Sequence, residues 1–407
     1  MQKPLKNGWR KVKLKEVCRE ITVGHVGSMA KEYVDEGIPF LRSQNILPFS
    51  LDLSSVKYIT PDFHAKLKKS AFVPGDVAVV RTGYPGTACV IPSKLSICNC
   101  ADLVIIRPSE EVNAKYLTCI FNSTWGQGTI AGTLVGVAQQ HFNVSAAKEM
   151  EVNLPPRHTQ DKIAAILSAY DRLIENNTRR IEILEEMARS IYHEWFVKFR
   201  FPGHEQVQMV DSELGLIPEG WEVVCLGKLA SFQTGKLNSN AAKPNGVYPF
   251  FTCSQEIFRT DTYSFDTECV LLAGNNANGV FHIKYFKGKF DAYQRTYVIR
   301  SLNQHKVTNY YLYFAIKAQL EHLKSISTGS ATKFLTLTIL NNLNIIVSLP
   351  EIQDKFAKFI FVVFSEIELL QAKNANLRKT RDLLLPRLIS GEIDVENLDI
   401  NTGEIAA

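Results

Sequence analysis

The residues best suited to chemistry lie in short polar loops rich in Arg, Asn, Gln, Lys, Ser and Thr. Such side chains can form hydrogen bonds with the edges of guanine and adenine, or contact phosphate groups. In the first part of the chain the candidates are Arg42, Ser43, Gln44, Asn45, Lys66, Lys68, Lys69, Arg81, Thr82, Tyr84, Gln139 and Gln140. Farther along the chain they are Ser254, Gln255, Asn275, Asn276, Asn278, Lys284, Lys287, Lys289, Gln294, Arg295, Thr328, Ser330 and Lys333.

We assign these candidates to two roles, contact with phosphates and recognition of bases. We expect the lysines to contact phosphates, because an ammonium group is a compact point charge. The residues expected to read bases are Gln44, Asn45, Arg81, Asn275, Asn276, Gln294 and Arg295. For each single residue, an ordinary turn-forming or solvated surface role is the alternative, and 275–279 also fits a polar hairpin turn.

Signatures of catalysis are absent from the sequence. No Asp or Glu stands two residues before a Lys, as in one large class of metal-dependent nucleases, and no Asn-Pro-Pro or Asp-Pro-Pro of amino-methyltransferases occurs. The chain has no G-x-x-x-x-G-K-[ST] loop for nucleotide phosphates. Its histidines and cysteines lack the spacing of zinc ligands. The sequence therefore predicts no catalytic residue, no metal site and no cofactor in this chain.

Composition allows a two-domain globular protein. The chain has 407 residues, 45% of them hydrophobic, and a net charge of +5. Residues 1–153 carry a net charge of +5 and residues 204–349 a net charge of +2, which is compatible with a polyanionic partner. No apolar run is long enough to span a membrane, and the cysteines form no C-x-x-C pair, so we expect a cytoplasmic protein.

The elements that must position these loops occur twice along the chain. Gly8-Trp9 returns as Gly220-Trp221, Pro39-Phe40 as Pro249-Phe250, and Leu154-Pro155 as Leu349-Pro350. Short apolar runs broken by Gly and Pro predict β-rich domains, with short helices near 61–69 and 113–124. The fold class expected is α+β, with two β-rich domains and two long helices. The expected segments are a first domain at 1–156, a helix at 157–203, a second domain at 204–350, a helix at 351–395 and a tail at 396–407.

The long helices carry apolar residues at alternating steps of three and four, which is typical of a coiled coil. In the first helix we assign Leu173 and Asn177 to this seam, with a one-residue stutter before Ile181 and Thr159 as the N-cap. Each helix is expected to be roughly 60 Å long at 1.5 Å per residue. Antiparallel pairing would give pseudo-two-fold symmetry and place Asn177 opposite Asn374. Two independent solvent-edge asparagines are the alternative.

Nearly the whole chain, from about 8 to 395, resembles the specificity subunit of type I restriction-modification systems. Three motifs carry the resemblance. They are the repeated Gly-Trp start, the Leu-Pro pair followed by Gln160 or Gln353, and the ending 383–393. The resemblance implies two target recognition domains that read an asymmetric bipartite site in double-stranded DNA. It also implies that the helices act as a spacer that docks two methyltransferase subunits.

Further partners and cofactors follow only from the resemblance. Restriction and translocase subunits would join through the complex, and S-adenosylmethionine, ATP and Mg would bind in partner subunits, in the cytoplasm of a bacterium or archaeon. Two other classes compete with this interpretation. A single-chain nuclease or methyltransferase would modify DNA without partners, and a protein scaffold would show neither sequence preference nor a salt-dependent affinity for DNA.

Overall fold

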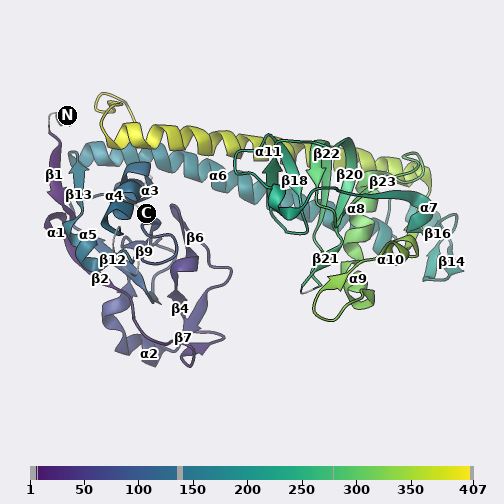
Figure 1. The fold of residues 1–407 in the computed structure, drawn as a ribbon, viewed down its shortest axis with the longest axis horizontal. Helices are drawn as coiled ribbons and strands as arrows, with labels where there is room; N and C mark the ends of the chain where they lie inside the picture. The colour runs from purple at the N-terminus through teal and green to yellow at the C-terminus, as the bar shows by residue number, and fades with distance from the viewer. Residues whose placement is uncertain (1–5, 7, 135–140, 278, 404–407) are drawn as a thin grey trace. The chain divides into compact units, whose positions relative to one another are not determined.

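The computed structural model describes residues 6, 8–134, 141–277 and 279–403, and it divides into two compact units (Figure 1). The first unit comprises residues 1–179 and 371–407, and the second comprises residues 180–370. The long helices α6 (Arg157–Tyr192) and α11 (Pro350–Ile389) each contribute one part to each unit. Each unit combines helices with sheets, as the α+β assignment predicts.

Two sheets form the β-rich part of the first unit. The strand orders are β10-β9-β12-β2 and β3-β7-β4-β11-β8. The strands of the first are Ala88–Val90, Val77–Val80, Leu103–Pro108 and Cys18–Val23; those of the second are Tyr33–Val34, Lys57–Ile59, Ile38–Leu41, Cys98–Cys100 and Ala71–Phe72. Every residue of β9 is buried, which suits its apolar sequence and its central place in the first sheet.

Short helices and one hairpin complete the first unit. The helices are α1 (Leu14–Val17), α2 (Pro61–Lys66), α3 (Ala114–Asn122), α4 (Thr124–Leu134) and α5 (Val144–Glu149), and the hairpin is β5 (Ile46–Leu47) with β6 (Ser50–Leu51). Helices α2 and α3 confirm the two short helices expected here. Side-chain oxygens of Thr60 and Asn113 cap them by accepting from the backbone N–H groups of Phe63 and Tyr116.

One larger sheet organises the second unit. Its order is β17-β23-β20-β22-β18-β19. The strands are Ala230–Thr234, Thr296–Ser301, Phe265–Ala273, Ile283–Ala292, Tyr248–Phe251 and Ile257–Thr260. Three small pairs join β14 (Met209–Ser212) to β15 (Gly215–Pro218), β16 (Glu222–Cys225) to β25 (Asn344–Val347), and β21 (Asn275–Asn276) to β24 (Lys333–Phe334). The helices are α7 (Leu226–Leu229), α8 (Asn309–Ala318), α9 (Leu320–Ile326) and α10 (Leu337–Asn341).

The two units share a strand plan that extends beyond the repeated sequence motifs. Strand β1 (Arg10–Lys13) pairs with β13 (Glu151–Leu154) in the first unit, as β16 pairs with β25 in the second. Ile105 pairs with Ala78 in one sheet, and Val298 pairs with Leu271 in the other. Residues 77–80, 103–106 and 151–154 of the first unit therefore correspond to the residues 193 places later, whereas the offset differs by one or two residues in some of the segments between them. The loops at these sheet edges can be compared between the two units.

The long helices pair inside each unit. In the first unit Arg381 Nη1 lies 2.6 Å from Asp171 Oδ1, and Asn177 Nδ2 donates a 2.9 Å hydrogen bond to Asn374 Oδ1. The partner numbers fall along one helix as they rise along the other, so the paired segments are antiparallel. In the second unit Arg180 contacts Glu366 at 3.0 Å. The pairing of Asn177 with Asn374 is confirmed.

Two details of the helix prediction were wrong. Leu173 is 51% exposed, whereas the neighbouring Ile174 supplies a backbone oxygen to Asn374 across the pair. With Ile174 in place of Leu173 the extra residue moves from between Asn177 and Ile181 to between Tyr170 and Ile174, where two steps of four follow one another. Thr159 does not cap α6, because the helix begins at Arg157 and Thr159 lies in its first turn.

The described helices include none whose length and apolar content would suit a membrane crossing. All eight cysteines are free, and five of them are buried. Burial raises the pKa of Cys89 and of Cys98 to about 12, which keeps both thiols protonated near neutral pH. No cluster of three or more His, Cys, Asp or Glu side chains that could hold a metal occurs among the described residues.

Candidate nucleic-acid interface

In the first unit a polar cluster forms where β9 ends. Thr82 donates a hydrogen bond of 3.1 Å to Asp102 Oδ2, and its hydroxyl also lies 2.8 Å from Nδ1 of His141. Arg81 Nη1 lies 2.8 Å from Asp102 Oδ1. Gly83 has a φ of +94°, a conformation that suits glycine, and Tyr84 beyond it is 85% exposed. The cluster offers an acidic acceptor, a hydroxyl and an imidazole beside an exposed aromatic ring.

Asp102 is the centre of this cluster. Its φ of +54° lies in the left-handed region, which is uncommon for a residue with a side chain and is found at functional sites. The side chain of Asp102 is 46% exposed and that of Arg81 is 22% exposed. Arg81 is therefore held by an ion pair, whereas part of the Asp102 carboxylate faces solvent. A carboxylate in this position can accept a hydrogen bond from an amino group of cytosine or adenine.

In the second unit a different polar cluster forms where β20 ends. Asn275 pairs with Phe334 between β21 and β24, and the Arg295 guanidinium carbon lies 5.5 Å from the centre of the Phe334 ring. The Arg295 backbone oxygen accepts a 2.8 Å hydrogen bond from the Gly274 N–H. Arg295 itself is exposed. The cluster thus presents a stacked guanidinium, which can donate two hydrogen bonds to guanine.

Two further side chains order this second cluster. Cys253 Sγ donates to Asn275 Oδ1 over 3.1 Å, which orients the amide. Lys284 Nζ donates a 2.7 Å hydrogen bond to the Ser254 backbone oxygen. Burial lowers the pKa of Lys284. Lys284 is half-buried, and its hydrogen bond ties it to a loop beside the cluster.

The two clusters occupy equivalent turns of the repeated scaffold. Thr82 and His141 correspond to Asn275 and Phe334, and the same backbone contacts place them. Asp102 and Arg295 lie in equivalent turns, but the backbone differs there, since Asp102 N–H bonds the His25 oxygen as Gln294 N–H bonds the Leu237 oxygen, and of the two clusters' central residues only Asp102 has a positive φ. Phe142 N–H donates to the Arg81 oxygen over 3.1 Å, as Leu335 N–H donates to the Gly274 oxygen over 2.9 Å. Equivalent backbone positions therefore carry different side chains in the two units.

The structure brings together only part of the predicted site. In the second unit contacts bring together Ser254 with Lys284, Asn276 with Lys333, and Asn275 with Arg295 around Phe334. Gln255, Gln294 and Ser330 lie near these residues in the sequence. Thr328 joins the group through its bridge to Phe334. Lys287 and Lys289 lie farther along β22, where Lys289 Nζ lies 4.8 Å from the centre of the Tyr263 ring. They do not belong to the cluster.

The segment from Arg42 to Asn45 has a mixed role. Asn45 is fully buried, accepts from the Arg42 N–H over 3.0 Å and donates to the Asp52 oxygen over 2.9 Å. Its amide supports the loop, so we leave Asn45 out of the residues proposed to read bases. Arg42 donates to the Ser55 oxygen over 2.8 Å, Gln44 is exposed and Ser43 is half-buried. The following hairpin β5–β6 and the loop at Tyr84 line a common pocket of about 650 Å³.

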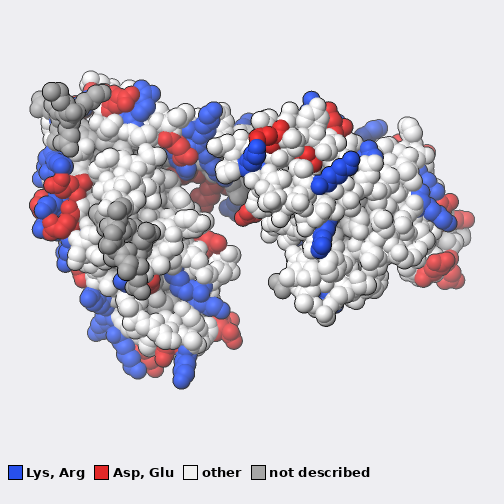
Figure 2. Space-filling model, viewed as in Figure 1, with Lys and Arg blue, Asp and Glu red and all other residues white. Residues whose placement is uncertain are grey.

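The basic side chains Lys66, Lys68 and Lys69 are exposed on α2 and the turn after it. Figure 2 shows Lys and Arg side chains gathered over the part of the first unit where α2 lies. They suit contact with a phosphate backbone, and they are separate from the cluster around Asp102 in sequence and fold. Gln139, Gln140 and Asn278 lie outside the described residues.

Sequence reasoning missed four residues of these clusters, namely Asp102, His141, Cys253 and Phe334. His141, Cys253 and Phe334 adjoin the candidates Gln140, Ser254 and Lys333, but none of the four missed residues is an Arg, Asn, Gln, Lys, Ser or Thr, the residue types on which the selection was based. The signal that could have found them is the repeat itself, because the residues that follow corresponding buried strands meet at corresponding places. A duplicated chain can thus reveal a site that neither half reveals alone.

The molecule has two β-rich units, each with a distinct polar cluster at one sheet edge, and its sequence has no catalytic motif. These features are those of a recognition protein. The chain belongs to the family described as the type I restriction modification DNA specificity domain, whose model matches residues 6–186 and 218–379. The family assignment accounts for both halves of the molecule. The chain is a DNA-specificity component and carries two such domains.

Individual relatives agree with the family. The chain is 32% identical to the EcoDI specificity subunit of Escherichia coli over 45% of this chain and 40% of that protein. It is 24% identical to the putative MjaX specificity subunit of Methanocaldococcus jannaschii over 95% of this chain and 94% of the relative. The solved S subunit of a type I restriction-modification system from M. genitalium has the same fold, with a TM-score of 0.59, 17% identity, and coverage of 95% of this chain and 97% of that one.

Proposed function

We propose that this chain is the sequence-reading subunit of a type I restriction-modification complex and that each unit reads one half of a bipartite site in double-stranded DNA. The observation that carries the proposal is the pair of clusters around Asp102 and Arg295. They lie in equivalent turns of the two units and carry opposite charges. An acceptor at one place and a donor at the other would select different base edges, so the two half-sites would differ.

Phosphate contacts supply affinity in this proposal. Lys66, Lys68 and Lys69 are exposed together and would neutralise phosphates beside the first half-site. Lys287 and Lys289 would act similarly beside the second. Base selection would come from Gln44, Thr82 and Asp102 in the first unit, and from Asn275, Gln294 and Arg295 in the second. Arg81 would position the Asp102 carboxylate through their ion pair.

Partners supply the chemistry that this chain lacks. Two methyltransferase subunits would dock on the scaffold that the two units repeat, and restriction and translocase subunits would join through the complex. S-adenosylmethionine, ATP and Mg would bind in those subunits. The equivalent pairs β1–β13 and β16–β25 support this division, because equivalent scaffold can present equivalent surfaces to two copies of one partner.

The test is the methylation pattern of host DNA, read base by base with and without this gene. A methylated sequence of two separated half-sites that disappears with the gene supports the proposal. Methylation or cleavage of DNA by the purified chain alone would contradict it. The paired helices add a second test, in which one heptad is deleted from each helix in register. The gap between the half-sites should shorten and the half-sites should stay unchanged.

A further inference from the structure

The hairpin β14–β15 of the second unit exposes apolar side chains on both strands. The exposed fractions are 44% for Met209, 37% for Val210 and 57% for Leu216, and Leu214 in the turn is 49% exposed. The two strands pair only with each other. Ile217 and Pro218 of β15 are buried and attach the hairpin to the core of the unit, whereas the four side chains above remain uncovered. These side chains therefore form a surface suited to a partner.

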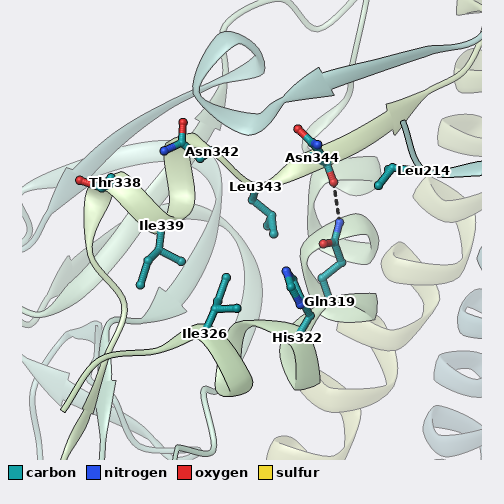
Figure 3. A pocket seen from close by; sticks show the side chains of 9 residues that line it. All are labelled: Leu214, Gln319, His322, Ile326, Thr338, Ile339, Asn342, Leu343 and Asn344. Carbon is teal, nitrogen blue, oxygen red and sulfur yellow. Dashed lines mark hydrogen bonds between the residues drawn. The ribbon is translucent and has the colours of Figure 1, made fainter. Parts of the chain in front are cut away.

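The hairpin borders a pocket of about 390 Å³ on the same unit. Ile326 of α9, Ile339 of α10 and Leu343 form its apolar lining, and Figure 3 shows Leu214 of the hairpin turn across the pocket from Ile339. A hydrogen bond of 2.9 Å from Gln319 Nε2 to the Asn344 oxygen fixes one wall. Pockets of this kind hold the apolar anchor residues of protein interfaces.

The charge of the residues on and beside the hairpin indicates the chemistry of its partner. From 201 to 227 the chain contains no Lys or Arg, whereas Glu205, Asp211, Glu213, Glu219 and Glu222 all lie within it. Acidic side chains lie at the end of the second unit where Figure 1 places β14 (Figure 2). Within the described parts of the chain, Asp211 and Glu213 have no ion-pair partner at 4.0 Å or less. Such a surface repels DNA phosphates and attracts basic protein segments.

We propose that the hairpin β14–β15 and the adjoining pocket form a docking surface for a basic, amphipathic segment of the methyltransferase subunit. This inference rests on the proposed function, which requires such a subunit, and it concerns the copy beside the second unit, because no hairpin among the described residues of the first unit corresponds to β14–β15. An apolar anchor of the partner would enter the pocket between Leu214 and Ile339, and its basic side chains would face Asp211 and Glu213. The surface lies on residues 209–218, apart from the cluster around Arg295.

Two variants of the full-length chain test the surface, with binding to the purified methyltransferase subunit measured by titration calorimetry at two salt concentrations. Leu214→Ser with Leu216→Ser removes the apolar anchor site, and Asp211→Lys with Glu213→Lys reverses the charge. Each should weaken binding at least tenfold, and the charge reversal should also remove most of the salt dependence. Leu302→Ser is the matched control, because Leu302 is 61% exposed in the same unit and lies outside the hairpin.

Each outcome decides the proposal. Unchanged binding by both variants overturns it, as does loss of DNA binding or of self-association in place of methyltransferase binding. If the serine variant lowers the melting temperature, the charge-reversal variant decides, because its exposed substitutions leave the hairpin backbone intact. Failure of the unmodified chain to bind the methyltransferase subunit would instead contradict the proposed function itself.

Discussion

The cluster around Asp102 and the cluster around Arg295 differ in charge although the strands that flank them pair in the same register. In the first unit Asp102 gathers Arg81 and Thr82 into a hydrogen-bonded group. In the second unit Arg295 stacks on Phe334, and Cys253 orients Asn275. The strand registers on both sides of these loops are equivalent. The scaffold therefore fixes where recognition residues stand, and the side chains alone set what they recognise.

Polar residues that support a loop can also be distinguished from polar residues that are available for recognition. Asn99 of β11 and Asp291 of β22 are both buried at equivalent parallel pairings, Asn99 with Phe40 and Asp291 with Phe250. Each accepts a hydrogen bond from the N–H of the next residue. A buried polar residue that recurs in both units belongs to the scaffold. An exposed polar residue that differs between them belongs to the recognition surface.

Exchange of a whole unit should have the largest effect. Replacing residues 10–150 with the corresponding segment of a relative that reads another sequence should change one half-site completely and leave the other intact. The physical reason is that the cluster around Asp102 moves with this segment, whereas the cluster around Arg295 stays. Base-resolved methylation of the host DNA measures the result. A change in both half-sites would show that the units do not read independently.

Single substitutions should also affect the recognition of one half-site and leave the other unchanged. Arg295→Ala should weaken discrimination in the second half-site by about 1–3 kcal/mol, roughly 5- to 150-fold, because a guanidinium paired with guanine is lost. Asp102→Asn should relax only the first half-site. Competition binding with DNA mutated in one half-site at a time measures both. Lys306→Ala is the control, since Lys306 bonds Glu222 on the scaffold and should affect neither.

The sequence located polar loops better than it located the contacts between them. Loops near Arg81 and Asn275 were found because polar residues cluster there, and both lie at the ends of buried strands. Asn45 was misjudged because a buried amide that bonds the backbone has the same sequence signal as an exposed one. Asp102 was missed because its role depends on contacts with residues distant in sequence, which local composition does not encode.

The asparagine pair should affect stability more than recognition. Asn177→Leu removes one partner and leaves the buried Asn374 with longer contacts to Thr178 and Ile174, at a cost of about 1–3 kcal/mol. The double change to Leu should cost less than the single one, because no buried polar group then lacks a partner. It should also loosen the alignment of the helices. Thermal unfolding and hydrogen exchange of the helix amides measure these effects. A double variant less stable than both single variants would contradict the argument.

Helix periodicity explains what could be predicted about the spacer. Both long helices were found, and Asn177 was placed opposite Asn374, because the spacing on each side fixes the register. Leu173 was chosen wrongly because Ile174 beside it is equally apolar, and periodicity alone cannot separate two adjacent apolar residues. The hydrogen bond from Asn374 to the Ile174 oxygen decides between them in the folded chain.

The smallest expected difference concerns Gln160 and Gln353, which are equivalent, equally buried residues at the starts of α6 and α11. Gln160 accepts from the Asn113 N–H and donates to the Glu111 and Pro155 oxygens, each over 2.9 Å. Within the described structure both side-chain polar atoms of Gln353 lack a partner. Gln160→Met should therefore cost about 1–3 kcal/mol of unfolding free energy, because it leaves buried backbone groups unpaired.

Gln353→Met provides the matched comparison. It should be neutral or stabilising, because it replaces a buried polar group that makes no hydrogen bond with an apolar one of similar size. Urea unfolding of the two variants side by side measures the difference. An equal loss in both would mean that Gln353 binds a group of its own, and the two helix starts would then be equivalent in energy as well as in backbone position. At the two helix starts, as in the two clusters, equivalent backbone positions would then carry side chains that make different contacts.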